Sequence, residues 1–114
     1  MNDCLFCKIV GKKVPAKIVY EDDQCVAFDD ISPQAPIHFL VIPKRHAASV
    51  AELGAADAGL LGHLMLTGGT VARQKNIADD GYRFVINTGK FGGQTVFHLH
   101  LHVLGGRPMH WPPG

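Results

Sequence analysis

The sequence carries almost no net charge, because 11 lysines and arginines nearly balance 10 aspartates and glutamates, leaving a formal charge of +1. It therefore does not predict the basic surface that nucleic-acid-binding proteins present. It also contains no apolar run long enough to cross a membrane and no signal-peptide pattern. These absences predict a soluble cytoplasmic protein that binds neither nucleic acid nor a membrane.

Cysteine is scarce as well, and three cysteines do not suggest a framework of disulfides. Two of them form the pattern Cys4-x-x-Cys7, which in a reducing compartment indicates metal or thiol chemistry. A thioredoxin-like redox motif would need a βαβ context, which this sequence does not supply. Cys25 stands alone in a β-rich run and is expected to be a small buried hydrophobic residue.

Length and hydrophobic content predict one domain. The chain has 114 residues, of which 46% are hydrophobic, and shows no internal repeat or low-complexity segment. That is enough chain for one sizeable core but not for two. We therefore expect residues 1–114 to form a single domain.

Histidine is abundant, with seven residues, and three of them alternate with apolar residues in the run 98–104. Such alternation predicts a half-buried β-strand, because successive side chains point to opposite faces. His98, His100 and His102 would line one face, and the apolar residues between them would face a core.

A glycine-bearing loop, residues 88–95, precedes this run. Backbone N–H groups in such a loop can approach an anion, so imidazoles beside it suit a phosphate. The histidines could also form a polar sheet face, or a metal site, because His-x-His can present two nitrogens to zinc. In a third interpretation, a neutral imidazole attacks phosphorus and a neighbouring imidazole protonates the leaving group or stabilises the developing charge.

Two helices are expected. The first covers about 3–10, with Asp3 as N-cap and Gly11 at its end, and the second covers about 55–76, after a capping-box pattern at 49–52. Gly68-Gly69 inside the second helix lowers helix stability by about 1 kcal/mol per glycine relative to alanine. Close packing of this helix on a sheet would explain why glycines stand there. The predicted apolar stripe of this helix is Leu60, Leu61, Leu64, Met65, Val71 and Ala72.

About five strands are expected, the first two as a hairpin and the third as a central strand. One long helix lies between the third and fourth strands, and the tail 105–114 has no pattern of regular structure. This order predicts an α+β fold with a mostly antiparallel sheet. The expected strands are 18–20, 25–28, 37–42, 82–87 and 98–104.

The run 98–104 matches the His-φ-His-φ-His-φ-φ signature, and the chain resembles the histidine triad (HIT) superfamily over almost its whole length. Within it, the chain is similar to the branch of histidine triad nucleotide-binding (Hint) proteins. Further segments carry this resemblance: 28–36, His38, Tyr82-Arg83, Asn87, Gly92-Gly93-Gln94, Gly105-Gly106-Arg107 and His110-Trp111-Pro112-Pro113-Gly114.

The resemblance implies a purine nucleoside phosphoramidate hydrolase, which releases a nucleoside 5′-monophosphate through a nucleotidyl-histidine intermediate. His100 would be the nucleophile, with His102 and His98 beside the phosphate and His38 as a fourth active-site histidine. By default, His38 on an apolar strand would instead be a core histidine. Thr95 stands where the branch usually has serine, which leaves the leaving-group preference open.

The resemblance also implies a nucleotide pocket. Asp30 would accept the ribose hydroxyls, and Asn87, Gly93 and Val96 would contact the phosphate. Without the resemblance, Asp30 could instead be a loop-capping residue and Asn87 a turn residue at the end of a strand. The apolar walls around the base would come from Phe6, Ile9, Phe28, Ile31 and Leu40, which could also be ordinary core residues.

Cys4 and Cys7 would supply two of the four ligands that a closed zinc site needs. Some bacterial members of the family resemble an arrangement in which His46 and His98 complete the set. If zinc binds His98, that residue becomes structural rather than catalytic.

The resemblance further implies a homodimer whose sheets join into one, with the tail 105–114 near the twofold axis. From that tail, Arg107 and Trp111 could reach the partner's site. Two other functions remain open: a nucleotide-binding or regulatory module with little turnover, and a dinucleoside polyphosphate hydrolase or nucleotidyltransferase of another HIT branch. The intact His100 favours an enzyme, and the ending Trp111-Pro112-Pro113-Gly114 argues against the other branches.

Overall fold

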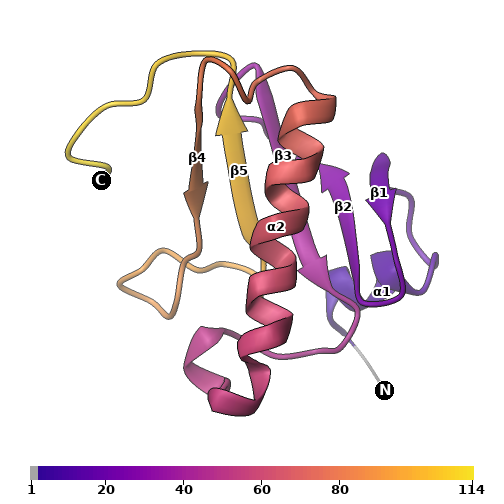
Figure 1. Cartoon of the computed structure of the whole chain (residues 1–114). Helices are drawn as coiled ribbons and strands as arrows, with labels where there is room; N and C mark the ends of the chain where they lie inside the picture. Colours follow the sequence, from indigo (N-terminus) through magenta and orange to yellow (C-terminus); the bar gives the residue numbers. More distant parts are fainter. Residues whose placement is uncertain (1–2) are drawn as a thin grey trace.

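The computed structural model describes residues 3–114 and has one five-stranded sheet with a helix on each face (Figure 1). The strand order is β1-β2-β3-β5-β4, and all neighbouring strands are antiparallel, as predicted. Among the described residues, no helix is long and apolar enough to span a membrane. The elements are α1 (Leu5–Val10), β1 (Ile18–Glu21), β2 (Cys25–Asp29), β3 (Ile37–Pro43), 3-10 turns at Val50–Glu52 and Ala55–Asp57, α2 (Ala58–Gln74), β4 (Tyr82–Val85) and β5 (Leu101–Gly105).

Helix α2 packs on one face of the sheet over the larger hydrophobic core. Gly68 explains the close approach: a Cβ there would lie 3.1 Å from the Phe84 ring and 3.2 Å from Leu101. The predicted stripe was wrong for Met65, which is exposed, because the buried face turns through Thr67 and Gly68 instead. This core includes Cys25, which is fully buried as expected.

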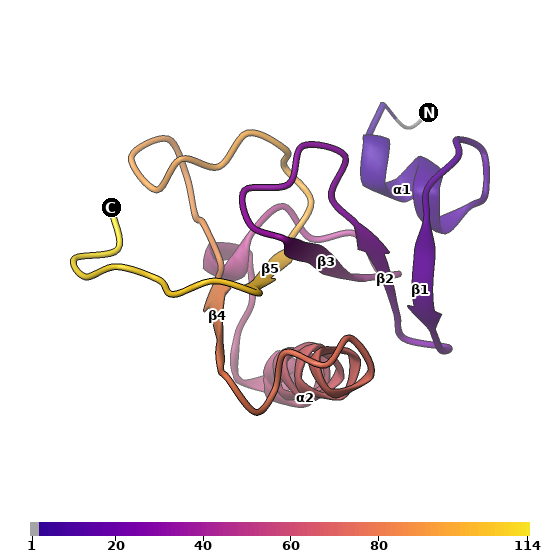
Figure 2. The ribbon, with the colours of Figure 1, turned by 90° about the horizontal axis from the view of Figure 1, so that it is seen from above.

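Helix α1 covers the opposite face of the sheet, as the view along the sheet in Figure 2 shows. Its Phe6 and Ile9 pack in a second core against β2 and β3. The predicted N-cap was wrong by one residue: Sγ of Cys4, not Asp3, accepts a hydrogen bond from the backbone N–H of Cys7. Gly11 ends the helix as predicted.

The histidine run is only partly a strand, because β5 begins at Leu101 and only His102 of the three histidines lies in it. The ladder to β3 ends at the pair Val41–Leu101, and the next positions on β3 lead to Pro43, which has no N–H to donate. The N–H of Leu99 donates instead to the carbonyl of Ala47. The predicted alternation of faces persists, since Leu99 and Leu101 are buried in the core under α2.

Candidate functional site

A pocket of about 290 Å³ opens between α1 and the sheet on the face away from α2. Its walls are mainly apolar, and Asp29, Asp30, His100 and His102 are among the polar residues that line it. Phe6 forms one wall, with its ring edge-on to His100 at a centroid distance of 5.1 Å. A mainly apolar cavity with a few convergent polar groups is the usual form of a small-molecule site.

Ten of the predicted site residues line this pocket, and four do not. Ile31 lines it while being 98% exposed, so it stands at the mouth. His38, Asn87, Gly93 and the fully buried His98 are outside the lining. The predicted residues that line it are Phe6, Ile9, Phe28, Asp30, Ile31, Leu40, Thr95, Val96, His100 and His102. The pocket is also lined by four residues that no sequence pattern indicated: Leu5, Pro15, Ala16 and Asp29.

Hydrogen bonding fixes the tautomer of His100. Its Nδ1 lies 2.7 Å from the carbonyl oxygen of His98, and because a carbonyl only accepts, Nδ1 carries the proton. The lone pair of the neutral ring is then on Nε2. His100 is therefore a buried imidazole beside the pocket whose second nitrogen can act as a nucleophile.

A second chain of hydrogen bonds fixes the tautomer of His102. The backbone N–H of Gln34 donates to His38 Nδ1, so Nε2 of neutral His38 carries the proton. That Nε2 lies 2.9 Å from Nδ1 of His102 and donates to it. Neutral His102 consequently carries its proton on Nε2, from which it can donate a hydrogen bond to another group.

The sheet register brings His38 and His102 together. Leu40 pairs with His102, and His38 pairs with Leu104, so the two histidines are diagonal neighbours on one face. Asp30 extends this group: its Oδ2 lies 3.4 Å from His38 Nε2, while its Oδ1 accepts from the N–H of Ser32. Asp30 thus does cap its loop, and it also lies on the pocket.

Burial favours the neutral forms of the His38 and His102 imidazoles. It lowers the pKa of His38, although the nearby Asp30 opposes the shift. It lowers the pKa of His102 to about 4, with the neighbouring His100 and His38 adding to the effect. At neutral pH His102 is therefore an uncharged imidazole, as the hydrogen-bond assignment requires.

Gln94 holds the glycine loop in place, a role that the sequence pattern did not reveal. Its buried side-chain amide donates to the carbonyls of Ala48 and Val96 and accepts from the N–H of Gly89. The N–H of Gly93 donates to Lys90 within the loop. The loop is thus braced by its own side chain next to Thr95 and Val96.

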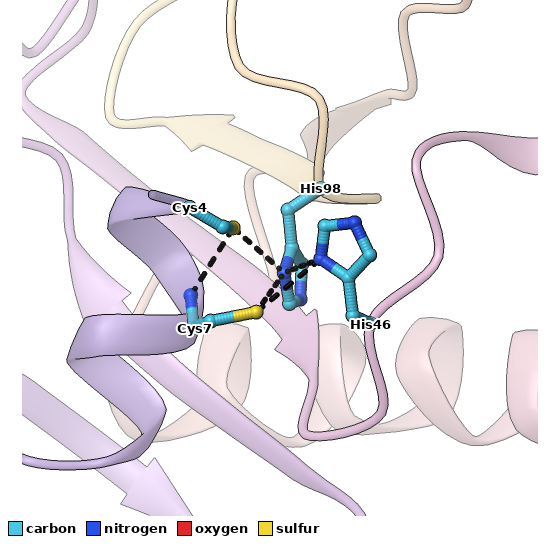
Figure 3. A group of neighbouring side chains, drawn as sticks. All are labelled: Cys4, Cys7, His46 and His98. Atoms are coloured by element: carbon cyan, nitrogen blue, oxygen red, sulfur yellow. Dashed lines mark hydrogen bonds between the residues drawn. The ribbon is translucent and has the colours of Figure 1, made fainter. Parts of the chain in front are cut away.

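A separate cluster joins Cys4, Cys7, His46 and His98, as Figure 3 shows. One ligand atom from each lies within 4.8 Å of all the others. Nδ1 of His98 is 3.3 Å from Sγ of Cys4, 3.4 Å from Sγ of Cys7 and 3.1 Å from Nδ1 of His46. Nδ1 of His46 is 3.2 Å from Sγ of Cys7.

The geometry of this cluster fits a tetrahedral zinc ion. In a tetrahedral site, Zn–S bonds of about 2.3 Å and Zn–N bonds of about 2.05 Å put S and N about 3.6 Å apart and two nitrogens about 3.3 Å apart. His98 Nε2 donates to the carbonyl of Pro43, which leaves its Nδ1 lone pair directed at the cluster. The residues present can therefore hold a metal.

The chain belongs to the HIT domain family, whose model matches residues 11–109. It is 56% identical to an uncharacterised HIT-like protein of Synechococcus elongatus over 99% of this chain and 98% of that protein. A HIT family hydrolase from Legionella pneumophila superposes with a TM-score of 0.96 at 46% identity, covering 98% of this chain and all of that one. A Zn-bound histidine triad family protein from Mycobacterium smegmatis superposes at 0.78 with 36% identity, covering 92% of this chain and 76% of that one. The chain thus has the fold of proteins described as HIT family hydrolases.

Proposed function

We propose that this protein hydrolyses the P–N bond of purine nucleoside 5′-phosphoramidates and releases a nucleoside monophosphate. The observation that carries the proposal is the hydrogen bond from His100 Nδ1–H to the carbonyl of His98, because it leaves Nε2 with a lone pair in a buried site. Two structural neighbours are described as HIT family hydrolases, which agrees with it.

In the first step, Nε2 of His100 attacks phosphorus and forms a P–N bond to the enzyme, while the substrate's P–N bond breaks. His102 stays neutral and donates a hydrogen bond from its Nε2–H to a phosphoryl oxygen, where negative charge develops as His100 attacks. The leaving nitrogen carries a proton taken up from solvent, so it departs as a neutral amine. In the second step, the oxygen of a water molecule attacks phosphorus, a proton of that water passes to the released amine, and the bond to His100 breaks. Both histidines are then in their starting states, and no step requires a metal.

The nucleotide would lie in the pocket under α1. Asp30 uses one lone pair for Ser32 and keeps acceptor sites for the two ribose hydroxyls. Phe6, Ile9 and Phe28 would pack on the base, with discrimination between bases that is modest because an apolar slot reads base edges poorly. Thr95 and Val96 line the pocket and are the proposed contacts on the phosphate side. The contacts proposed for Asn87 and Gly93 rest on the family resemblance alone, because both residues lie outside the lining and the N–H of Gly93 already donates to the carbonyl of Lys90.

The Cys4, Cys7, His46 and His98 cluster would hold one structural zinc ion, as the Zn-bound Mycobacterium smegmatis neighbour suggests. The metal would supply a rigid link between α1, the segment after β3 and the segment before β5. We expect about one zinc per chain by elemental analysis and its loss in Cys7→Ser. Metal-free protein that stays folded and shows no affinity for zinc would contradict this assignment.

The activity test is AMP release from adenosine 5′-phosphoramidate. Wild type should turn over and His100→Ala should not, whereas His63→Gln should retain full activity because His63 pairs with Asp22 away from the pocket. An adenylylated His100 peptide, trapped by rapid quench and identified by mass spectrometry, would identify the intermediate. Wild-type protein that binds AMP without turnover would instead indicate a nucleotide-binding module.

A further inference from the structure

The cluster of cysteines and histidines is built into the walls of the pocket. Cys4 and Cys7 belong to the N-terminal end of α1, and the same helix supplies Phe6 and Ile9 to the pocket. Figure 3 shows both sulfurs directed at the imidazoles of His46 and His98. Any change in the two thiols therefore acts on a pocket wall.

The cluster also reaches the proposed nucleophile through the backbone. His98 contributes its Nδ1 to the cluster and its carbonyl oxygen to His100 Nδ1, at 2.7 Å. Phe6 contacts both rings, with centroid distances of 6.0 Å to His98 and 5.1 Å to His100. Two routes thus connect the thiols to His100, one through His98 and one through Phe6.

Helix α1 depends on these contacts because it has only six residues. A helix of that length has no stability of its own and is held by tertiary packing. Its attachments are Phe6 and Ile9 in the core and the two cysteines in the cluster. Removing the second attachment should loosen α1 and open the pocket.

We propose that Cys4 and Cys7 form a redox-modification site, at which oxidation to a disulfide releases zinc and weakens nucleotide binding. Their sulfurs lie within 4.8 Å of each other, and the Cys-x-x-Cys spacing is that of disulfides that form and break. The inference rests on the zinc site and the nucleotide pocket proposed above, and it makes the protein a target of oxidation rather than an oxidoreductase.

The oxidant class is hydrogen peroxide. One thiol is oxidised to a sulfenic acid while the peroxide is reduced to water. The second sulfur then attacks the sulfenic sulfur and the S–S bond forms. The departing hydroxide becomes a second water by taking a proton from the attacking thiol, or from solvent where that sulfur is a thiolate. Bonded to each other, the sulfurs no longer offer thiolates, so the metal loses two of its four ligands.

The test titrates zinc-loaded, full-length protein with hydrogen peroxide. Three quantities are followed: remaining thiols, zinc released to a chelating dye, and AMP affinity by calorimetry. We expect loss of two of the three thiols, release of zinc, and AMP binding weakened on the order of tenfold, reversed by dithiothreitol and zinc. Hydrogen exchange of the Leu5–Val10 amides should rise in the oxidised form.

Two variants serve as controls. Cys25→Ala removes the buried third thiol, which lies in the other core, and should keep the whole response. Cys7→Ser cannot form the disulfide and should show no reversible change in AMP affinity, with circular dichroism establishing that it is folded.

Thiols that survive peroxide in the zinc-loaded protein would overturn the inference, as would a Cys4–Cys7 disulfide that leaves both AMP affinity and α1 exchange unchanged. The same experiment distinguishes failure of this inference from failure of the proposed zinc site or of the proposed nucleotide pocket. Reduced protein without zinc would remove the metal assignment, and reduced protein that does not bind AMP would remove the nucleotide site. In either case thiol counting and hydrogen exchange still decide whether oxidation displaces α1.

Discussion

In the candidate site, hydrogen bonds to single residues determine which ring nitrogen of each histidine carries the proton. The carbonyl of His98 holds the proton on Nδ1 of His100, and the N–H of Gln34 fixes His38, which fixes His102. The spacing of His98, His100 and His102 predicted these three as a group, whereas His38 was assigned to the site only through the family resemblance. The sequence could not predict Gln34 as the origin of the chain, since that contact is made through backbone atoms of a loop.

His38 should therefore act by positioning the proton of His102. His38→Leu removes the N–H that holds His102, so we expect kcat to fall about 10–100-fold with KM nearly unchanged. His38→Gln, which keeps an N–H donor, should lose less. Equal losses in the two variants would argue that the donor has no role.

Acid should destabilise the fold through the same residues. Burial lowers the pKa of His38 and His102, the latter to about 4, whereas unfolded histidines titrate near 6.5. As pH falls below about 6.5 the unfolded chain takes up protons that the folded chain does not, so stability present at pH 7 is lost. For His102 the loss between pH 7 and pH 5.5 should be about 1 kcal/mol in urea denaturation with zinc saturating. His102→Asn should show a correspondingly smaller change.

At the scale of elements, the sequence pattern predicts which helices and strands form, but it does not predict where each of them begins and ends. All five strands and both helices were predicted, because their periodicities are long enough to be read. The start of β5 was wrong because it depends on Pro43 of another strand and on the Ala47 carbonyl. The segment 86–100 is irregular, so the positions of Asn87 and Gly93 relative to the pocket could not be read from a local pattern.

Two glycines of α2 give a matched test of its packing. Gly68→Ala should destabilise by about 1 kcal/mol net, because overpacking against Phe84 and Leu101 outweighs the gain in helix propensity. Gly62→Ala has no atom within 4 Å of the new Cβ and should stabilise by up to about 1 kcal/mol. Thermal denaturation measures both, and a stabilised Gly68→Ala would mean that α2 can move off the sheet.

At the scale of the whole molecule, one edge and the tail suit a second copy of the chain. β4 has a neighbouring strand on one side only, and the tail runs out past it in both views. Tyr82, Phe91 and Trp111 are exposed, with Trp111 at 83%. Large exposed aromatic side chains are costly to hydrate and often mark interfaces, which supports the proposed homodimer.

Light scattering should give the mass of two chains, near twice 12.3 kDa. The single chain has a radius of gyration of 13.7 Å, and a compact assembly of two should approach about 17 Å in X-ray scattering. Trp111→Ala should shift the equilibrium toward single chains if the tail lies in the contact. A stable, active single chain at all concentrations would contradict the dimer.

The place of β5 has a consequence for synthesis on the ribosome. β5 is the last strand in sequence, yet it lies between β3 and β4, and the contacts of Cys4 with His98 span 94 residues. Until that segment leaves the exit tunnel, β3 and β4 have no strand between them, and α1 has no His98 to meet. A nascent chain lacking this segment has neither the proposed nucleophile nor the complete sheet, so the proposed activity should arise in one late event rather than accumulate during translation.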